Sequence, residues 1–306
     1  MTSIVFSHSA DAALRAAEVL NAGGLVGLPT ETVYGLAARA DLDDAVGKIF
    51  RAKCRPADHP LILHISHSTD LHRYAVNVPP EAMTLVEQCW PGPLTLLLHK
   101  SAEVSHLVTG GRDTVAIRVP ANDCARNIID LCGHAVAAPS ANVFGHVSPS
   151  TAQHVYDDLG DHVDLIIDDG DCTIGVESTI VDFTTPQPQL LRPGGLAVED
   201  LESIMDQKLG TPSGESRASG MLASHYAPKC AVVLAENIAE ANALHDAIPN
   251  SRVLDHWENY PLYAASLYSQ MRQADTDGVS TIIAVLPPKS GLGYAIGDRL
   301  SKASFL

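Results

Sequence analysis

The stretch GLPTETVYGL, residues 27–36, places a polar turn directly after a short apolar run. Residues 25–28 predict a buried strand, and Pro29 predicts its end, because proline has no N–H to donate to a neighbouring strand. Two threonines, a glutamate and a tyrosine follow, and Gly35 closes the turn. Polar side chains at the end of a buried strand commonly form a binding site. The simpler interpretation is a strand–turn–strand corner in which the hydroxyls bond their own backbone.

The composition sets limits on size and on partners. With 306 residues the chain suits one large domain or two modest ones, and an apolar fraction of 46% is ample for a core. The formal net charge of -16 is unfavourable for non-specific binding of nucleic acid, which depends on neutralising phosphates with Lys and Arg. We therefore expect weak or no direct nucleic-acid binding.

The cysteines and the N-terminal residues indicate the compartment. The six cysteines contain no C-x-x-C pair and no cluster with zinc-ligand spacing, so we expect no metal site held by the protein itself. Residues 1–8 lack the basic region and the apolar run of a signal peptide. No apolar stretch approaches the ~20 residues that span a membrane. The sequence thus predicts a cytoplasmic protein without a membrane partner.

The order of the expected elements predicts the fold class. In residues 1–210 strands outnumber helices, and several strands follow one another with no helix between them. That order favours an α/β domain with a mixed, twisted sheet flanked by helices over a regular doubly wound fold. Expected strands include residues 25–28, 61–65 and 115–119.

The composition changes after residue 210. Residues 211–229 are rich in Ser, Gly and Pro, as in a linker, yet His225 and Tyr226 are not residues that a passive tether needs. Residues 230–306 then alternate strand and helix three times. This alternation predicts a small Rossmann-like α/β domain with a three-stranded parallel sheet.

Familiar sequence motifs for nucleotides and hydrolases do not fit the chain. There is no Walker A sequence, so a nucleotide would not be held by a P-loop. The run GLGYAIG at residues 291–297 resembles a dinucleotide fingerprint with one residue too many, and we interpret it as a helix start. No G-x-S-x-G elbow is present for a serine hydrolase.

Three cations in the first 120 residues need an explanation. Arg118 interrupts the apolar residues 115–119, and a charge in a buried strand is costly unless it is paired, so Arg118 needs a carboxylate or an anionic ligand. Lys53 and Arg55 follow a helix expected over residues 43–52. Favourable interaction with the helix dipole is the simple explanation for this pair, and a clamp for a triphosphate is the functional one.

The candidate side chains taken together are hydroxyls and cations. They are Thr30, Thr32, Thr114, Ser140, Ser148, Ser178, Lys53, Arg55, Arg118 and Arg192. Hydroxyls combined with guanidinium groups suit polyanions and small zwitterions. No acid–base pair or covalent nucleophile stands out, which favours group transfer at phosphorus, where catalysis is mainly positioning and charge stabilisation.

Six motifs in register resemble those of one family. They are GLPTETVYGL at 27–36, KCRP to PLILH at 53–64, TVAIRVP at 114–120, PSAN at 139–142, EST at 177–179 and RPG at 192–194. In this order and spacing they resemble the threonylcarbamoyl-AMP synthase family (YrdC-like). The resemblance continues through HYAP at 225–228 into a tail like that of the longer, two-domain members.

The resemblance implies an activity. Members of the family condense L-threonine, bicarbonate or CO2 and ATP into threonylcarbamoyl-AMP and pyrophosphate. The product supplies the threonylcarbamoyl group that a downstream transferase machinery places on an adenosine of tRNA. Mg²⁺ would enter with ATP, and no organic cofactor is implied.

The resemblance also implies roles for residues of this chain. The family's threonine positions fall on Thr32, His64, Arg118, Ser140 and Ser178. The ATP positions fall on Arg55, His59, Thr114, Ala138 (through its backbone), Asn142, Ser148, Arg192 and Tyr226. Lys53 and Arg55 would be the catalytic pair. His59 departs from the pattern, since asparagine is frequent there, but a neutral imidazole can replace the amide's hydrogen bond.

Two other functions remain open at this point. A carbamoyl-transferring relative that acts in hydrogenase maturation has a similar domain, but it carries acylphosphatase and zinc-finger segments that are absent from this sequence. A binding module for double-stranded RNA or ribosome assembly would use the concave face of the same domain. The net negative charge argues against that second alternative.

Overall fold

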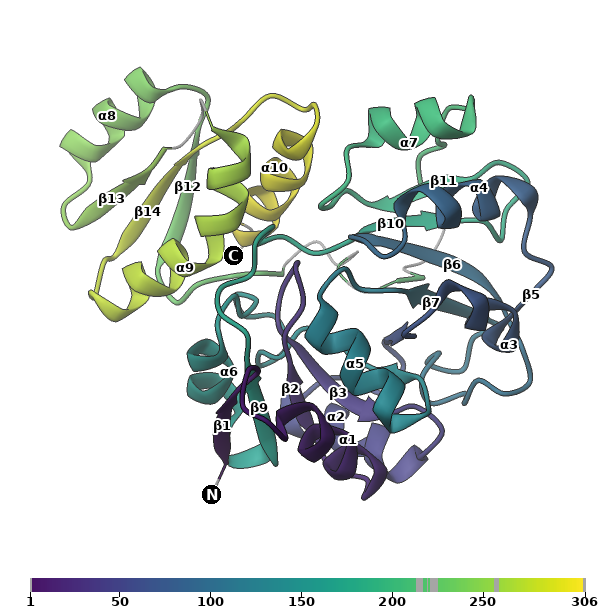
Figure 1. Cartoon of the computed structure of the whole chain (residues 1–306). Coiled ribbons are helices and arrows are strands. Elements are labelled where there is room, and N and C mark those ends of the chain that lie inside the picture. Colours follow the sequence, from purple (N-terminus) through teal and green to yellow (C-terminus); the bar gives the residue numbers. More distant parts are fainter. Residues whose placement is uncertain (1, 213–216, 219, 221–224, 256–258, 305–306) are drawn as a thin grey trace.

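The computed structural model describes residues 2–212, 217–218, 220, 225–255 and 259–304. The first part of the chain forms a large mixed sheet flanked by helices, and the tail forms a separate three-stranded parallel sheet (Figure 1). Both sheets confirm the predicted α/β architecture. Part of the expected linker, residues 211–229, lies outside the described residues. Within the described residues, no helix is both long enough and apolar enough to cross a membrane.

The large sheet brings together strands from distant parts of the chain. Its order among the described residues is β1-β9-β2-β3-β8-β4-β7-β6-β10-β11, with β5 beside β6. The strands are β1 (Ser3–Phe6), β2 (Val26–Leu28), β3 (Gly35–Arg39), β4 (Ile62–His64), β5 (Ala75–Val76), β6 (Leu94–Lys100), β7 (Thr114–Arg118), β8 (Val136–Ala137), β9 (Leu165–Asp168), β10 (Thr179–Asp182) and β11 (Gln189–Arg192). β4 pairs with β7 in parallel, whereas β3 and β4 each pair with β8 antiparallel. The polar turn after β2 therefore lies against the end of β8, where Gly35 bridges to Ser140.

Helices cover both faces of one half of this sheet. On one face α1 (Ala12–Asn21) and α5 (Asp123–Cys132) pack on residues such as Ala37 of β3. On the other face lie α2 (Asp43–Lys53), α4 (Pro80–Cys89) and α6 (Ala152–Leu159), and here Leu36 and Ala38 of the same strand enter the core. Because neighbouring strand residues point to opposite faces, a strand buried on both faces is apolar throughout. The remaining helices of this part are α3 (Leu71–Tyr74) and α7 (Val198–Met205).

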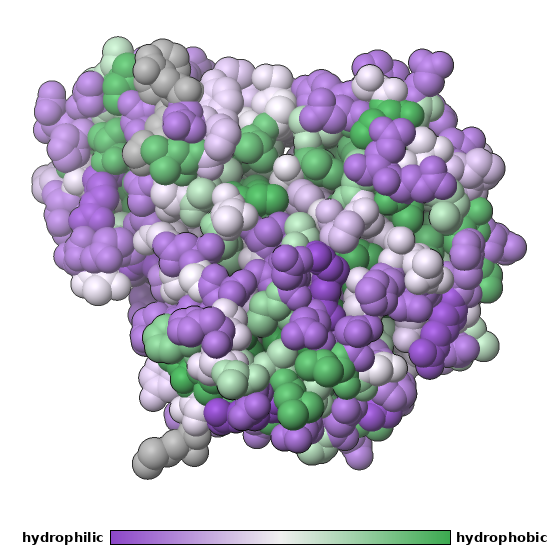
Figure 2. Space-filling model, in the orientation of Figure 1, coloured by the Kyte–Doolittle hydropathy of each residue, from purple (hydrophilic) through white to green (hydrophobic). Residues whose placement is uncertain are grey.

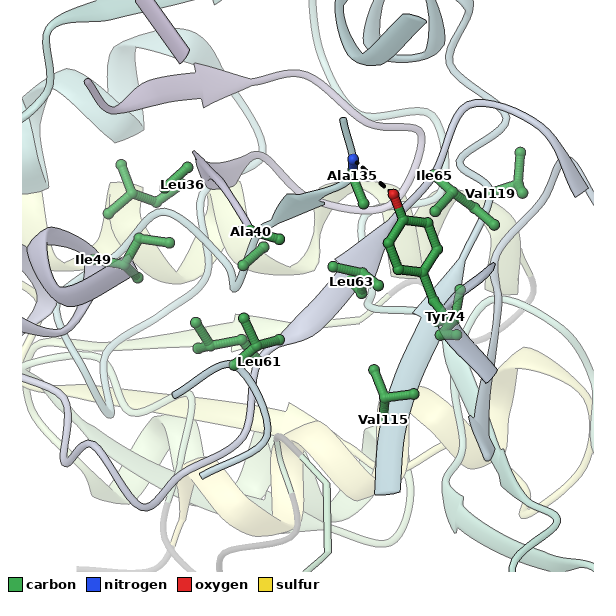
Figure 3. Packing of buried hydrophobic residues seen from close by; sticks show 14 of the residues in the cluster. Leu36, Ala40, Ile49, Leu61, Leu63, Ile65, Tyr74, Val115, Val119 and Ala135 are labelled. Atoms are coloured by element: carbon green, nitrogen blue, oxygen red, sulfur yellow. Dashed lines mark hydrogen bonds between the residues drawn. The ribbon is translucent and has the colours of Figure 1, made fainter. Parts of the chain in front are cut away.

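Figure 3 shows the larger of these two cores from close by. In this view the ring of Tyr74 is drawn among Leu63, Ile65, Val115 and Val119, and its hydroxyl accepts a hydrogen bond from the N–H of Ala135 at 3.4 Å. The ring is thus buried without leaving its hydroxyl unpaired, as burial of a polar group requires. Outside, hydrophilic residues dominate the visible face, and apolar residues gather in scattered patches (Figure 2).

The other half of the sheet has one face that no described helix covers. Its inward residues on this face are Ile62, Leu97, Ala116, Ile180 and Leu191, from β4, β6, β7, β10 and β11. Their cluster is completed by Ala218, a residue of the expected linker. Ala218 therefore lies on this face, and Ile62 of the same cluster also lines a cavity.

The tail is the predicted small α/β unit. Its sheet has the order β12-β14-β13, all parallel. The elements are β12 (Ala231–Ala235), α8 (Ile238–Ala247), β13 (Ser251–Leu254), α9 (Tyr260–Thr276), β14 (Thr281–Val285) and α10 (Leu292–Ala303). Gly291 immediately precedes α10 as its N-cap residue, so the glycine-rich run at residues 291–297 is a helix start, as predicted.

The tail packs directly on the main part of the chain. Val33, Val147 and Val176 belong to one apolar cluster with Tyr263 and Leu267 of α9. A polar contact accompanies this packing, because Arg272 of α9 donates to both carboxylate oxygens of Asp158 at 2.9 and 2.7 Å. The two sheets are therefore joined by a shared core and not only by a tether.

Two local predictions were incomplete. The strands β1 and β5 were not expected, and both are short: β1 is at one end of the sheet order, and β5 pairs outside that order with the last residues of β6. Lys53 was expected just past the helix end but is the last residue of α2. The helix stops because Cys54 adopts a left-handed conformation with φ of 52°, and the chain turns there.

Candidate active site

A cavity lies on the face of the large sheet that no described helix covers, and Gly220, His225 and Tyr226 of the linker are among its lining residues. About 540 Å³ in and around it is free of protein atoms, and this figure includes open solvent at its mouth. Its lining residues come from the β2–β3 turn, the segment after α2, strands β4 and β7, the segments around the ends of β8 and β10, strand β11, and the linker. They are Thr30, Thr32, Val33, Gly35, Arg55, Ile62, His64, Arg118, Ala138, Pro139, Ser140, Glu177, Ser178, Arg192, Gly220, His225 and Tyr226.

Strand register places two of the predicted side chains next to each other. His64 of β4 and Arg118 of β7 are direct partners in the parallel ladder. Each lies two residues after a member of the linker-facing apolar cluster, Ile62 and Ala116, so both point to the same face of the sheet. The register thus brings an imidazole and a guanidinium to the floor of the cavity.

Arg118 has the anionic partner that its burial requires. Its Nη2 donates to Oε1 of Glu31 at 2.5 Å, its Nη1 to Oγ1 of Thr32 at 2.8 Å, and its Nε to the carbonyl of Gly92 at 3.1 Å. Burial by itself would raise the pKa of Glu31, but the Arg118 cation and hydrogen bonds from Arg118 and from backbone N–H groups together outweigh burial and lower it. The prediction of a partner for Arg118 is confirmed, and the partner is a protein carboxylate.

His64 is held as a neutral ring. Burial lowers its pKa to about 3, and the Arg118 cation adds to this effect. Its Nδ1 lies 3.2 Å from the carbonyl oxygen of Ile62, which fixes the proton on that nitrogen. The Nε2 atom is then a hydrogen-bond acceptor.

The two threonines of the polar turn have different roles. Thr30 Oγ1 donates to the carbonyl of Val33 at 2.6 Å and accepts from nearby backbone N–H groups, which is the local bonding expected of an ordinary turn. Thr32 Oγ1 accepts from Arg118 instead. The simpler interpretation of the turn thus holds for the bonding of Thr30, although both threonines line the cavity, and Thr32 is the one bonded to Arg118.

Ser178 and Arg192 form a second polar group of the cavity. The Nε and Nη2 atoms of Arg192 donate to the carbonyl of Ser178 at 3.1 and 3.0 Å, and Nη2 also reaches the Ser178 hydroxyl at 3.1 Å. That hydroxyl also lies 2.7 Å from Oγ1 of Thr95. These bonds fix the start of β10 and the end of β11 relative to each other.

Arg55 enters the cavity just past α2. Its Nη2 donates to the carbonyl of Pro60 at 2.9 Å, and its guanidinium carbon lies 5.4 Å from the centre of the Phe144 ring. Burial lowers the pKa of Arg55 to about 10, which leaves it a cation at neutral pH. A buried cation lining a cavity is not the surface partner of a helix dipole, so the simple explanation does not fit Arg55.

Lys53 lies behind the cavity wall. Its ammonium group donates to the carbonyl oxygens of Ser140, at 2.5 Å, and Asn142, and its side chain is fully buried. Burial lowers its pKa well below the usual value, and the neighbouring Arg55 adds to the effect. Lys53 therefore fastens the backbone of residues 140–142 to α2, and it is not among the lining residues.

Some predicted ATP positions also lie outside the lining. Among the described residues these are His59, Thr114, Asn142 and Ser148. The Asn142 amide donates to the carbonyls of Val143 and His146, and the Ser148 hydroxyl donates to Glu177. The other predicted residues line the cavity together, as does Ala138.

Glu31, Glu177 and His225 are functional candidates that the sequence did not single out as site residues. Glu31 holds Arg118, while Glu177 and His225 line the cavity. Each stands beside a predicted residue, at Thr32, Ser178 or Tyr226, so their place in the motifs was the available signal. Among the described residues, no group of three or more His, Cys, Asp or Glu side chains is arranged to hold a metal ion.

Known proteins share this fold and sequence over nearly the whole chain. Residues 18–194 match the Sua5–YciO–YrdC family model, described as "Telomere recombination", and residues 196–304 match the model described as "Threonylcarbamoyl-AMP synthase, C-terminal domain". A threonylcarbamoyl-AMP synthase of Pyrococcus abyssi is 41% identical, over 94% of this chain and 93% of the relative. One of Bacillus subtilis is 38% identical, over 95% and 92%.

A solved structure agrees with the computed one. The crystal structure of P. abyssi Sua5 complexed with L-threonine superposes with a TM-score of 0.93 at 37% identity, covering 99% of this chain and 97% of that chain. Sequence and fold agree across both parts of the chain, including the tail. The chain therefore belongs to the threonylcarbamoyl-AMP synthase family.

Proposed function

We propose that this chain condenses L-threonine, bicarbonate or CO2 and ATP into threonylcarbamoyl-AMP and pyrophosphate. The observation that carries the proposal is one cavity lined by Arg118, Thr32 and His64 together with Arg55 and Arg192. The first three residues suit a small zwitterion and the last two suit a polyphosphate. The product would pass to a transferase that modifies tRNA in the cytoplasm.

Arg118 would hold the threonine carboxylate. A guanidinium has five N–H groups, and the bonds to Glu31, Thr32 and Gly92 occupy three of them. The remaining N–H groups suit a carboxylate, which guanidinium groups commonly hold through two bonds. The neutral His64 and the hydroxyls of Ser140 and Ser178 would receive the other polar groups of threonine.

ATP would lie along the rest of the cavity. Arg55 and Arg192 would neutralise its phosphates, and the backbone of Ala138 would meet the nucleoside. Mg²⁺ would arrive as part of the substrate MgATP. His59, Thr114, Asn142 and Ser148 remain proposed ATP contacts, and their place behind the lining means that they would act at its margin.

The reaction would have two steps. The threonine amine attacks CO2, forms a carbamate and loses a proton to solvent. A carbamate oxygen then attacks the α-phosphorus in line, and the bond to pyrophosphate breaks. Arg55 would stabilise the charge that grows on pyrophosphate, and Lys53 would contribute by holding residues 140–142 in place.

The linker would shield the product from water. Tyr226 lines the cavity, is 1% exposed and adopts a left-handed backbone with φ of 63°. Adenylates hydrolyse readily, so a cover that excludes water preserves the product. We assign that role to residues 225–226, with the domain limits proposed at 1–210, 211–229 and 230–306.

The proposal is tested by incubation with ATP, L-threonine and labelled bicarbonate. The expected result is release of pyrophosphate with a labelled adenylate. L-valine should support far less release, since a site built around a hydroxyl leaves buried polar groups unpaired when the hydroxyl is missing. Equal release with valine, or turnover of carbamoyl phosphate in place of threonine and bicarbonate, would overturn the proposal.

A further inference from the structure

Glu177 is the point where three parts of the chain meet. Its carboxylate accepts from the hydroxyl of Ser148 at 2.7 Å, from the hydroxyl of Tyr268 on α9 at 2.9 Å, and from Nε of Arg299 on α10 at 2.7 Å. Its own carbonyl accepts from the N–H of Gly195 at 3.0 Å. Both ends of Glu177 are thus fixed, and the next residue is the site residue Ser178.

Arg299 is buried to an unusual degree for an arginine. Its side chain is 0% exposed, although it lies on a helix of the small tail domain. A buried guanidinium is tolerated when carboxylates pair with it, and here Glu177 and Asp298 do so. A helix that needed only to dock would present an apolar residue at this position, as it does at Ile296 and Leu300.

Arg299 also supports the linker. Its guanidinium carbon lies 5.0 Å from the centre of the Tyr226 ring, a cation–π contact, and Tyr226 stacks on Tyr268 with ring centres 5.8 Å apart. The same helix also forms two hydrogen bonds with the linker. Lys302 donates through Nζ to the carbonyl of Gly220 at 2.7 Å, and its own carbonyl accepts from the N–H of His225 at 3.4 Å.

We propose that Arg299 is a positioning residue of the active site, through which the tail holds Glu177 and Tyr226 in their places at the cavity. One side chain contacts the residue before Ser178 and the aromatic ring that lines the cavity beside Arg192. The tail thus completes the site and does more than dock against it. This inference rests on the proposed function, because the groups that it positions are the proposed ATP and threonine contacts.

The test compares full-length variants. Arg299→Met and Glu177→Gln each break the pair, and the combined variant removes both of its charges, so neither partner is left buried without the other. Arg252→Met is the matched control, since Arg252 is also a tail arginine paired with a carboxylate, Asp277, at 2.6 Å, but on the surface. Pyrophosphate release, thermal unfolding and calorimetric binding of ATP are measured for each.

Each single variant should lower kcat/KM for ATP on the order of 10²-fold, as misplacement of a site by remote changes does. The combined variant should fold and lose little more activity than the worse single variant, because the two residues act as a unit. Arg299→Lys should recover part of the loss, because it keeps a positive charge next to the Glu177 carboxylate. The KM for ATP should rise more than the KM for threonine, because Ser178 is the one proposed threonine contact next to Glu177, whereas Arg118 and His64 lie on strands of the main sheet.

A folded combined variant with wild-type kinetic constants and wild-type affinity for ATP would overturn the proposal. So would equal losses in the Arg252→Met control. If the wild-type chain releases no pyrophosphate with threonine, the proposed function fails instead. In that case the affinity of the folded variants for ATP still decides the role of Arg299.

Discussion

The guanidinium of Arg118 and the carboxylate of Glu31 form a buried ion pair, with Nη2 of Arg118 2.5 Å from Oε1 of Glu31. The side chains are 4% and 9% exposed, so water does little to screen their attraction. The pair also explains the glutamate of the polar turn. A threonine carboxylate would meet an arginine that is already oriented and partly neutralised.

Glu31→Gln should therefore destabilise the chain. Loss of one partner leaves a buried cation without its counter-charge, and we expect the free energy of unfolding to fall on the order of 2–4 kcal/mol. Urea unfolding measures this fall. Saturating L-threonine should raise the melting temperature of the variant more than that of the wild type, because the substrate carboxylate replaces the missing charge.

Glu103→Gln is the control for that prediction. Glu103 pairs with Arg73 at 2.7 Å, but both side chains are about half exposed, at 56% and 48%. Surface pairs of this kind contribute about 0–1 kcal/mol. Equal losses of unfolding free energy in the two variants would mean that the buried Arg118–Glu31 pair stabilises the fold no more than a surface pair does.

Arg55→Ala should impair the use of ATP while the fold survives. The guanidinium lines the cavity and donates to the backbone carbonyls of His59 and Pro60, so its loss removes a proposed phosphate contact. We expect the KM for ATP to rise on the order of tenfold or more. Steady-state kinetics measure it, and Arg51→Ala, an exposed arginine on the last turn of α2, should behave as the wild type.

Lys53→Met separates structural support from direct contact with ATP. The substitution removes two hydrogen bonds to the carbonyls of Ser140 and Asn142, so the free energy of unfolding should fall by about 2 kcal/mol. Activity should fall less than in Arg55→Ala, because no lining group is lost. Thermal unfolding and kinetics are compared with Lys48→Met, whose exposed ammonium bonds one carbonyl, that of Gly23. Wild-type stability with lost activity would show that Lys53 acts on ATP directly.

Acid should weaken the junction between the two sheets. Burial would raise the pKa of Glu177, but the cations Arg299 and Arg192 and the hydroxyl of Ser148 lower it to about 2, from an ordinary value of 4.5. A carboxyl with a lowered folded pKa stabilises the fold above its unfolded pKa, and that stability is lost as pH falls through 4.5 toward 2. The loss from this one group is on the order of 3 kcal/mol.

Urea unfolding between pH 6 and pH 3 checks this dependence. Glu177→Gln should flatten the decline in the free energy of unfolding, although Glu31, whose pKa is also lowered, keeps part of the slope. An unchanged slope in the variant would show that Glu177 is not the titrating group.

The sequence predicted the elements well because each carries its own pattern. Helix α2 and strand β7 lie within one residue of their expected positions, and Arg118, a charge in an apolar strand, has the partner that was expected for it. Register could not be predicted in this way, because the pairing of His64 with Arg118 depends on how two separate strands align. The contact between Glu31 of the polar turn and Arg118 also depends on how separate segments align, so it could not be predicted either.

Lys53 and Arg55 show the limit at the level of single residues. They are two positions apart, so the sequence predicted the same place and the same role for both. The left-handed Cys54 between them ends α2, so Lys53 stays on the helix and Arg55 turns into the cavity. The burial of Arg299 could have been predicted from its spacing. It lies four residues after Ala295 and four before Ala303, on the buried face of α10.

The apolar cluster that joins Val33, Val147 and Val176 to helix α9 has a consequence for how the chain loses its structure. Neither sheet can open there without exposing the hydrophobic residues of the other, so the two melt as one cooperative unit. We therefore expect calorimetry to show a single unfolding transition, although the sequence composition marks a boundary between the two parts of the chain.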